Sequence, residues 1–357
     1  MLNLAYKKGL IILFNKFKSI RKRIQIYRFV SFPLGKKVYI IGTPEHGNTG
    51  DHAIAIAEKK FLVSNGYSAL RIKEISCTEY FDYAHLYKRY IRRNSLICGM
   101  GGGNLGDLWI EGEFFRYKLI SDFPDNPMLI FPQTIYFTNT DSGRKLLETS
   151  KEYYNGKKGL TIVAREQTSF DLLKEYFKVP RHLLVPDMVL YTSLKDYGVL
   201  KQTDRDSYVL LVFRQDKEKV LDDAEKEIII KQLEEKKIEY KTGDTICNKQ
   251  VNKSNREAII KEEIQEFANA KLVITDRLHG MIFSTISATP CIVLGNNHHK
   301  IKDSHAWISY LPYVKFANSI AEVEELIPKL LRLKDCRFDN TPLLEYYNKL
   351  FEAVQGT

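Results

Sequence analysis

Arg277 and His279 are the two residues of this sequence whose types and spacing point most directly to chemistry. They follow an apolar run at residues 271–274 and precede a second apolar segment that predicts a helix. The first amides of a helix and the positive end of its dipole both favour an anion. Arg277 can hold a carboxylate or a phosphate through two parallel hydrogen bonds, and His279 can exchange protons near neutral pH. The pair therefore predicts acid–base chemistry on an anionic substrate, the alternative for His279 being a structural histidine that only caps the helix.

A glycine-containing loop at residues 47–51 follows another apolar run, residues 37–41. Gly50 has no Cβ that would keep a ligand away from the backbone, and Asn48 and Asp51 lie where a helix begins. Asp51 either caps this helix or accepts a proton from a substrate hydroxyl. The loop is not a Walker phosphate loop, because no Gly-Lys-Ser or Gly-Lys-Thr sequence follows it.

Three consecutive glycines, residues 101–103, follow the apolar segment 95–98. Such a run is unfavourable inside a strand unless the backbone bends or contacts a ligand. We therefore expect a loop that faces the substrate with Gly102, Gly103 and Asn104, or else a tight structural turn.

Arg165 and Arg214 each follow a predicted strand, at residues 160–164 and 208–213. Ligands of open parallel sheets bind beyond the carboxyl ends of the strands. A single arginine at a strand end is usually solvated or paired with an acid, but Arg165 would lie in a different domain from Arg277. Two guanidinium groups that face each other across a cleft can hold a small dianion or trianion. Arg214 also follows a predicted strand, but the argument that it binds a ligand is weaker.

The five cysteines are scattered, odd in number and without the spacing of metal ligands, so we expect neither disulfides nor a zinc site. The adjacent pair His298 and His299, next to Lys300, fits a loop that contacts a ligand better than it fits a metal site, because no third ligand is evident. No bound metal is therefore expected.

Short apolar runs that alternate with longer amphipathic segments predict parallel sheets with crossover helices. A length of 357 residues with 44% hydrophobic and 27% charged residues suits two globular domains and excludes wholesale disorder. We expect an α/β protein with two Rossmann-like doubly wound domains at residues 36–190 and 207–335, a linker at 191–206, and a final helix at 336–357 that can pack across the junction. Strands are expected at residues 37–41, 95–98, 128–131, 160–164 and 183–185, and then at 208–213, 272–275 and 291–294. Helices are expected at residues 53–65, 142–154, 169–177, 222–236, 256–268, 277–288, 319–333 (interrupted at Pro328) and 342–354.

Residues 1–35 form a basic arm. No acidic residue precedes Glu45, while ten lysines and arginines lie at or before Lys37, a number equal to the net charge of +10. Apolar residues recur among them at helical spacing, which predicts a basic amphipathic helix. Such a helix can pack on the body of the protein with a solvated basic face, or it can lie on an anionic membrane surface.

Nucleic acid is the least favoured partner of this arm, because no interleaved aromatic and basic pattern continues beyond it. Its longest uncharged stretch, residues 9–15, is too short to span a bilayer, and no signal peptide is evident. The protein is therefore expected in the cytosol, and at the inner face of the membrane if the arm docks there and does not pack on the protein.

The ordered set of motifs resembles the polysaccharide pyruvyltransferase family. The resemblance covers roughly residues 38–300 and rests on the loop 47–51, the glycines 101–103, Pro132-Gln133, Arg165 with Ser169, Pro186-Asp187 and Arg277-Leu278-His279-Gly280. It implies two domains arranged as in GT-B glycosyltransferases and transfer of pyruvate from phosphoenolpyruvate to a sugar as a cyclic ketal. The sequence departs from the family's pattern at residues 131–134 and 287–289. Both departures concern the expected acceptor side, so the resemblance does not identify the acceptor sugar.

The resemblance implies donor-binding roles for Arg277, Leu278, His279 and, by its position after a strand, Arg165. Gly280 and Arg214 are added to the donor side by their placement. We expect His279 to be the general acid and Asp51 the base, with phosphoenolpyruvate as co-substrate and no cofactor or metal. The acceptor side, in the first domain, is expected to include Asn48, Gly50, Gly102, Gly103, Asn104 and Gln133.

The acceptor is expected to be a lipid-linked or nucleotide-linked sugar, and a lipid-linked one would explain the basic arm. The alternative function is that of a GT-B-like glycosyltransferase that uses a nucleotide sugar. Against it, no acidic residue is placed for a nucleotide ribose in the second domain. A cleft that binds sugar or nucleic acid without catalysis is the least favoured interpretation.

Overall fold

The computed structural model describes residues 19–356 except 201–204, 206–207, 216–218, 220 and 296–298. The first domain is built on a seven-stranded parallel sheet in the order β2-β1-β3-β5-β6-β7, with β4 paired to β5. Its strands are β1 (Val38–Thr43), β2 (Ile72–Ser76), β3 (Leu96–Gly99), β4 (Gly102–Gly106), β5 (Met128–Tyr136), β6 (Leu160–Ala164) and β7 (Arg181–Leu184). Its helices are α2 (Thr49–Ser64), α3 (Cys77–Tyr90), α4 (Ile110–Asp122), α5 (Asp141–Gly156) and α6 (Gln167–Tyr176).

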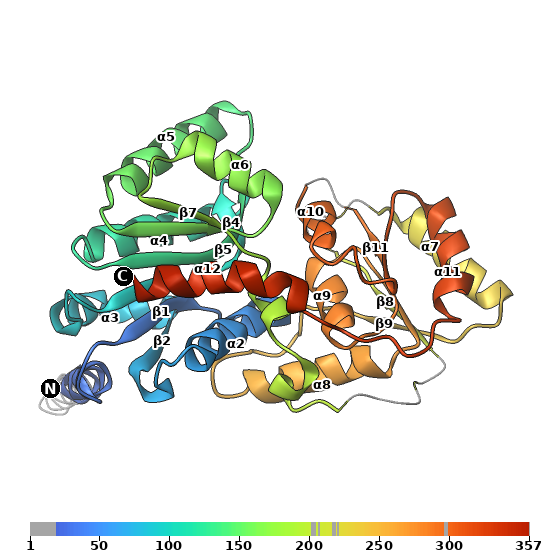
Figure 1. Ribbon diagram of the computed structural model, residues 1–357, viewed down its shortest axis with the longest axis horizontal. Coiled ribbons are helices and arrows are strands. Elements are labelled where there is room, and N and C mark those ends of the chain that lie inside the picture. Colours follow the sequence, from blue (N-terminus) through green and yellow to red (C-terminus); the bar gives the residue numbers. More distant parts are fainter. Residues whose placement is uncertain are drawn as a thin grey trace, which may run out of the picture.

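The second domain is built on a five-stranded parallel sheet in the order β12-β11-β10-β8-β9. Its strands are β8 (Val209–Val212), β9 (Tyr240–Gly243), β10 (Leu272–Thr275), β11 (Cys291–Leu294) and β12 (Val314–Ala317). Its helices are α7 (Asp223–Glu235), α8 (Arg256–Asn269), α9 (Leu278–Ile286), α10 (Lys300–Ala306) and α11 (Ile320–Leu330). Figure 1 shows the two domains side by side, so the predicted α/β class with two parallel-sheet domains is confirmed.

One continuous hydrophobic core joins the two domains at their junction. α2 and α9 both pack against the short 3-10 helix η2 (Met188–Tyr191), which follows the first sheet. The shared core includes Phe61 of α2, Met188 of η2 and Phe283 of α9. All nine residues of α9 are buried, as expected for a helix that is apolar on every side. The beginnings of α2 and α9 are therefore held in place by packing on both sides of the junction.

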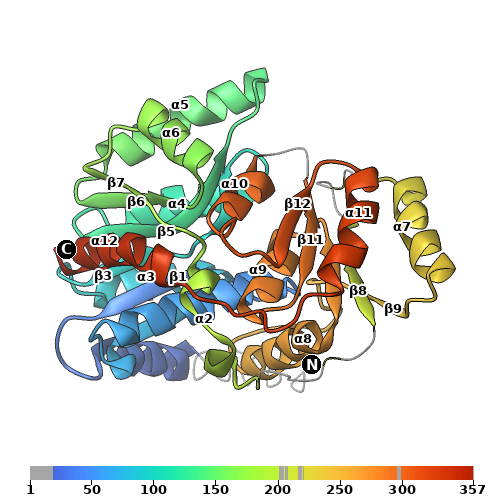
Figure 2. The ribbon, with the colours of Figure 1, turned by 45° about the vertical axis from the view of Figure 1, so that its right-hand side comes forward.

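The C-terminal helix α12 (Leu344–Gln355) lies against the first domain, although the chain reaches it from the second (Figures 1 and 2). The Tyr347 hydroxyl donates to the carbonyl of Asp187 at 2.7 Å, and the hydroxyl of Tyr67 in the first domain donates to the carbonyl of Val354 at 3.2 Å. α12 thus ties the end of the chain to the segment that leaves the first sheet.

The prediction of a loop or turn at the triple glycine is wrong, because Gly102 and Gly103 begin strand β4. Gly102 has a φ of +149°, and the pairing of β4 with β5 shifts register between Gly102 and Leu105. The strand therefore bends where glycine permits a backbone conformation that other residues rarely adopt.

The predicted interruption at Pro328 is also wrong, because α11 continues through this residue to Leu330. Proline removes the hydrogen bond to the carbonyl four residues earlier, which belongs to Glu324. Glu324 and Pro328 both lie on the exposed face of α11, where water can bind that carbonyl.

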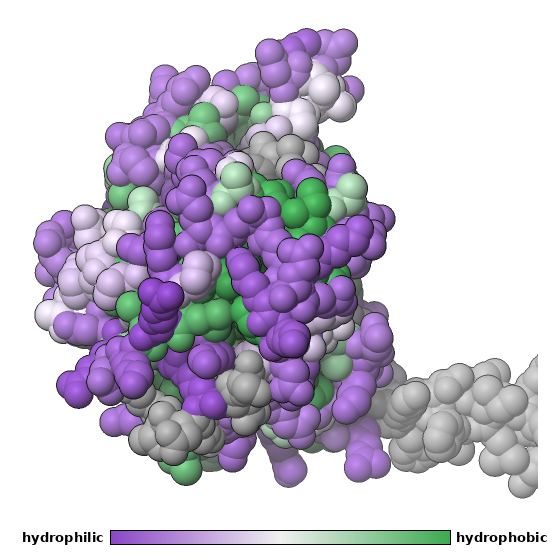
Figure 3. Space-filling view, turned by 90° about the vertical axis from the view of Figure 1, so that its right-hand side faces the viewer, coloured by the Kyte–Doolittle hydropathy of each residue, from purple (hydrophilic) through white to green (hydrophobic). Residues whose placement is uncertain are grey.

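None of the described helices is long and apolar enough to cross a bilayer. The face of the second domain in Figure 3 is mostly hydrophilic, with apolar side chains mainly near its middle. The N-terminal helix, residues 19–31, lies on the first domain and carries exposed apolar residues.

Candidate functional site

α9 begins directly after β10, and a tight turn sets its direction. The Thr275 hydroxyl accepts a hydrogen bond from the Arg277 amide at 3.0 Å, and Asp276 accepts one from the Arg214 amide at 2.8 Å. A Cβ added to Gly280 would overlap the Thr275 side chain, so the first turn of α9 needs glycine to pack against the strand end. The N-cap side chain of α9, Arg277, makes no capping hydrogen bond. The buried start of α9 therefore retains amides that can serve an anion.

Arg277 is buried beside the loop that follows β9. Its Nε and Nη2 atoms lie 2.6 and 3.1 Å from the two carboxylate oxygens of Asp244. Nη2 donates a hydrogen bond to one oxygen, and Nε forms a close ion pair with the other. Arg214 is buried at the end of β8, and its backbone contacts Asp276, whose pKa burial raises.

His279 lies at the contact between the two domains. Its ring packs on Gly50, where an added Cβ would overlap the imidazole. Its Nε2 atom is 3.7 Å from an Asp187 oxygen and has no hydrogen-bond partner among the described residues, although the residue is only 9% exposed. Burial lowers the pKa of His279, and the carboxylates of Asp187 and Asp51 oppose this effect. The free protein therefore holds a neutral imidazole whose pKa a nearby anion would raise.

Arg165 is buried at the end of β6 in a network of its own domain. Its guanidinium donates to Glu166 at 2.7 Å, to Asp187 at 2.9 Å and to the Thr134 hydroxyl at 2.7 and 3.0 Å. Asp187 therefore links Arg165 of the first domain to His279 of the second. A Cβ on Gly103 would lie 3.0 Å from the Arg165 Nη2 atom, so this glycine leaves room beside the guanidinium.

The second domain also covers Arg165 through the segment around α10. Trp307 donates from its indole nitrogen to the Arg165 carbonyl at 2.8 Å, and the His299 Nε2 atom lies 3.2 Å from the Ser169 hydroxyl. His298, the other member of the histidine pair, lies outside the described residues. In the described part of the chain, no three His, Cys, Asp or Glu side chains come together as a metal site would require.

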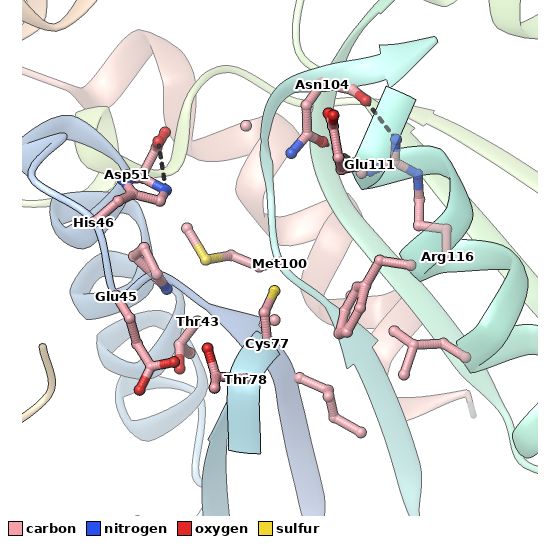
Figure 4. Close-up of a pocket in the computed structure, with 18 of the residues that line it drawn as sticks. Thr43, Glu45, His46, Asp51, Cys77, Thr78, Met100, Asn104, Glu111 and Arg116 are labelled. Atoms are coloured by element: carbon pink, nitrogen blue, oxygen red, sulfur yellow. Dashed lines mark hydrogen bonds and ion pairs between the residues drawn. The ribbon is translucent and has the colours of Figure 1, made fainter. Parts of the chain in front are cut away.

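A pocket of about 430 Å³ opens at the carboxyl ends of β1, β3 and the start of β4 (Figure 4). Its charged lining has three carboxylates, from Glu45, Asp51 and Glu111, and the guanidinium of Arg116, which is itself paired with Glu113. Asp51 accepts a hydrogen bond from the Asn48 side chain at 2.9 Å and lies 3.6 Å from the His46 imidazole. The apolar wall is formed mainly by Phe81, Met100, Phe115 and Leu119. A pocket with this lining is better suited to the hydroxyls and apolar faces of a sugar than to an anion.

The far wall of the pocket, residues 100–104, is held by buried polar side chains. Gln133 donates to the Met100 carbonyl at 2.7 Å, and Glu58 of α2 accepts from the Gly101 amide at 2.7 Å. Burial raises the pKa of Glu58 well above its usual range. Asn104 is fixed by the Arg116 guanidinium at 2.7 Å.

The structure places the predicted residues in two adjoining groups. Asp51, Gly102 and Asn104 line the pocket, and Asn48 and Gln133 hold its walls. Gly50 and Gly103 face the other way, toward His279 and Arg165 respectively. Gly50 of α2 and Gly103 of β4 thus lie between the acidic pocket and a buried group formed by Arg165, Asp187 and His279.

Asp187, Asp244 and His46 were not assigned roles from sequence. Asp187 follows the predicted strand at residues 183–185, so its place at a strand end was a signal that could have identified it. His46 had a similar signal, because it follows the predicted strand at residues 37–41. Asp244 had none, because β9, the strand before it, was not predicted.

The fold and the facing helix beginnings define a two-domain α/β protein of the GT-B-like class. The UDP-GlcNAc 2-epimerase of Methanocaldococcus jannaschii matches 90% of this chain and all of its own with a TM-score of 0.51 and 12% sequence identity, which shows the fold alone. The family model described as polysaccharide pyruvyl transferase matches residues 48–298. The chain belongs to this family, as its motifs indicated.

Two relatives extend this result. General stress protein 30 of Bacillus subtilis is 35% identical over 325 residues, which cover 87% of this chain and 91% of the relative. Pyruvyl transferase 1 of Schizosaccharomyces pombe is 30% identical over 290 residues, which cover 76% of this chain and 70% of the relative.

Proposed function

We propose that this protein transfers pyruvate from phosphoenolpyruvate to two hydroxyls of one sugar as a cyclic ketal and releases phosphate. The observation that carries the proposal is the position of His279. Its buried Nε2 atom has no hydrogen-bond partner among the described residues, yet it lies at the start of α9 beside Asp187. A buried polar atom without a partner is costly unless a ligand satisfies it.

The donor is proposed to bind at the beginning of α9. Phosphoenolpyruvate carries a carboxylate and a phosphate, which match an arginine fork and helix-terminal amides. Asp244 already presents a carboxylate to the fork of Arg277, and the donor carboxylate would take its place. Arg165 would contact the donor on the side left open by Gly103, while its other contacts keep Asp187 near His279.

The proposed reaction begins when His279 donates a proton to the methylene carbon of the enol. This step turns the methylene into a methyl group and leaves a cation-like centre at the neighbouring carbon. One sugar hydroxyl attacks that centre and loses its proton to Asp51. The second hydroxyl then displaces phosphate from the same carbon, and its proton leaves with the phosphate, while the proton on Asp51 returns to the imidazole through solvent.

The acceptor sugar is proposed to occupy the acidic pocket. Its carboxylates can accept hydrogen bonds from hydroxyls, and they disfavour the anionic donor. Asn48 binds one oxygen of Asp51, which orients this carboxylate as the base. Asp51 directly follows Gly50, which packs on His279, so acceptor and donor would meet across the glycine. The acceptor is proposed to be a sugar linked to a lipid or to a nucleotide.

The test is to incubate the protein with phosphoenolpyruvate and a panel of lipid-linked and nucleotide-linked sugars. We expect phosphate release that depends on an acceptor, and a product heavier by one ketal-bound pyruvate in its mass spectrum. Thermal shift should show stabilisation by phosphoenolpyruvate in preference to nucleotide sugars. Release of a nucleotide from a nucleotide sugar, with no use of phosphoenolpyruvate, would instead identify a glycosyltransferase.

A further inference from the structure

The described N-terminal helix, residues 19–31, is firmly attached to α3. Ile26 and Val30 are buried in the core of the first domain. Lys22 forms an ion pair of 3.0 Å with Glu79, and the Arg23 Nε atom donates to the Tyr90 hydroxyl at 3.1 Å. The orientation of this helix relative to the body of the protein is therefore defined.

A neighbouring side of this helix carries a largely exposed apolar stripe, of which Tyr27 packs edge-on against Tyr90 of α3 with ring centroids 5.3 Å apart. Ile20, Ile24 and Tyr27 are 47%, 49% and 53% exposed, and their spacing places them along one side of the helix. On the helical wheel, Arg21 and Arg28 lie along one edge of this stripe. Further along the chain, Phe32 and Leu34 are exposed as well.

The sequence of the helix that carries the stripe, and of the residues around it in the chain, has charge of a single sign. No acidic residue occurs before Glu45, and the residues up to Lys37 include ten lysines and arginines. A second copy of this chain would bring like charges together at the same face, which opposes self-association. A nucleic acid would match the charge but would leave the isoleucines without an apolar partner. A lipid surface with anionic headgroups and an apolar interior would match both the basic side chains and the apolar stripe.

We propose that the face formed by Ile20, Arg21, Ile24, Tyr27 and Arg28 docks on an anionic lipid surface. The apolar stripe enters the headgroup boundary, and the basic side chains contact acidic headgroups. This inference rests on the exposed face of the helix and not on the proposed transfer reaction.

Docking of the helix on a lipid surface would also fix the orientation of the pocket relative to the bilayer. Lys22 holds the helix to Glu79 in the first turn of α3, and the neighbouring residues Cys77, Thr78 and Phe81 line the pocket. Phe81 is exposed, as are Trp109 and Phe114, which flank the pocket residues Glu111 and Gly112 in sequence. If the proposed function holds, docking of the helix brings this apolar rim close to the bilayer, where a lipid-linked acceptor would be presented.

The experiment measures sedimentation of the full-length protein with phosphatidylcholine vesicles, with and without phosphatidylglycerol. We expect binding that requires phosphatidylglycerol and weakens in high salt, because screening shortens the reach of the headgroup charge. Arg21→Gln with Arg28→Gln should lower the partition coefficient by about 30-fold, at about 1 kcal/mol for each basic residue removed. Ile20→Ser with Ile24→Ser should lower it by about tenfold or more through the loss of apolar burial.

Matched controls are Lys145→Gln with Lys158→Gln, which remove two exposed charges near α5, and Ile228→Ser, which removes an isoleucine of 44% exposure on α7. Both control proteins should bind vesicles as the wild type does. Equal binding by the helix variants and the wild type, or equal binding to neutral and anionic vesicles, would overturn the proposal. So would a wild-type dimer in solution that the Ile20→Ser and Ile24→Ser changes convert to monomer. Thermal shift with phosphoenolpyruvate tests the proposed reaction separately, since none of these positions lies at α9.

Discussion

The first turns of α2 and α9 face each other across the domain junction, and they differ in chemistry although both follow the end of a parallel strand. α2 is capped by the Asn48 side chain and carries the carboxylate of Asp51. α9 has no side-chain cap and carries Arg277 and His279. Gly50 of α2 packs directly on the His279 ring. One backbone arrangement, used twice, thus presents a carboxylate at one helix start and an arginine with an imidazole at the other, and the proposed division between a sugar and an anion rests on this difference.

The strongest way to break this division is to remove the imidazole on the α9 side. His279→Ala should lower kcat by about 10²- to 10⁴-fold, the usual contribution of a general acid, with a smaller change in donor affinity. Steady-state kinetics with each substrate varied would measure this effect. His182→Ala, at a half-buried histidine that contacts only the Phe177 carbonyl among the bonds described, is the control and should leave kcat unchanged. Turnover by His279→Ala at the wild-type rate would remove this residue from the mechanism.

The corresponding change on the α2 side is Asp51→Asn, which keeps the shape of the side chain and removes the carboxylate that we propose as the base. We expect kcat to fall by about 10²-fold while donor binding, followed by thermal shift with phosphoenolpyruvate, stays the same. Asp141→Asn also removes a carboxylate from the first turn of a helix, α5, and controls for the helix dipole. A weaker donor interaction in Asp51→Asn would mean that the two helix beginnings do not divide the substrates as proposed.

Gly50→Ala tests the contact between the two sides. The added methyl would overlap the imidazole of His279, so we expect a loss of about 1–3 kcal/mol in the free energy of unfolding together with lower kcat. Gly156→Ala is the matched control, because a Cβ there meets no atom within 4 Å. Denaturant unfolding and kinetics on both variants would check this, and a fully active, fully stable Gly50→Ala protein would contradict the packing described here.

Arg277→Lys tests the proposed donor side of the site alone. Lysine keeps the charge but loses the fork that now holds Asp244, so donor KM should rise by about tenfold at a nearly constant acceptor KM. Arg144→Lys, at an exposed arginine on α5, provides the control. An effect on acceptor KM instead would place Arg277 on the other side of the site.

The smallest expected effect is the pH dependence of donor binding. Burial lowers the pKa of His279, so the free imidazole is neutral near pH 7, and a bound anion would raise this pKa. Donor binding should then take up a proton, and donor affinity should weaken as pH rises from the pKa of the free protein to that of the complex. His279→Gln should remove this part of the dependence while keeping the part that arises from the donor's own phosphate. Identical pH profiles of donor affinity for the two proteins would show that His279 does not titrate on binding.

Sequence reasoning located three buried central strands well but ended another too early, because the strand expected at 128–131 continues as β5 to Tyr136. The strands at 160–164, 272–275 and 291–294 match β6, β10 and β11 residue for residue, because each is a short, mostly apolar run. β2, β9 and β12 were not predicted, and each lies at the edge of its sheet. An edge strand has a partly solvated face, so its apolar pattern is interrupted by polar residues and gives a weaker signal.

For the site, the sequence by itself determined which residue types follow each strand. In a parallel α/β fold those residues must collect at the carboxyl edges of the two sheets, and this sufficed to select the segments at 47–51, 101–104 and 275–280. It also determined the concentration of positive charge before residue 38, since composition needs no fold.

Only the tertiary structure decided how these residues pair. Asp187 lies 22 positions from Arg165 and 92 from His279, yet it contacts Arg165 and approaches His279. Asp244 likewise meets Arg277 only because β8, β9 and β10 lie side by side. Such pairings depend on where the domains dock, and docking is set by the shared apolar core of α2, η2 and α9. Burial in that core also displaces the pKa of His279, an effect of low local dielectric that no local sequence pattern can encode.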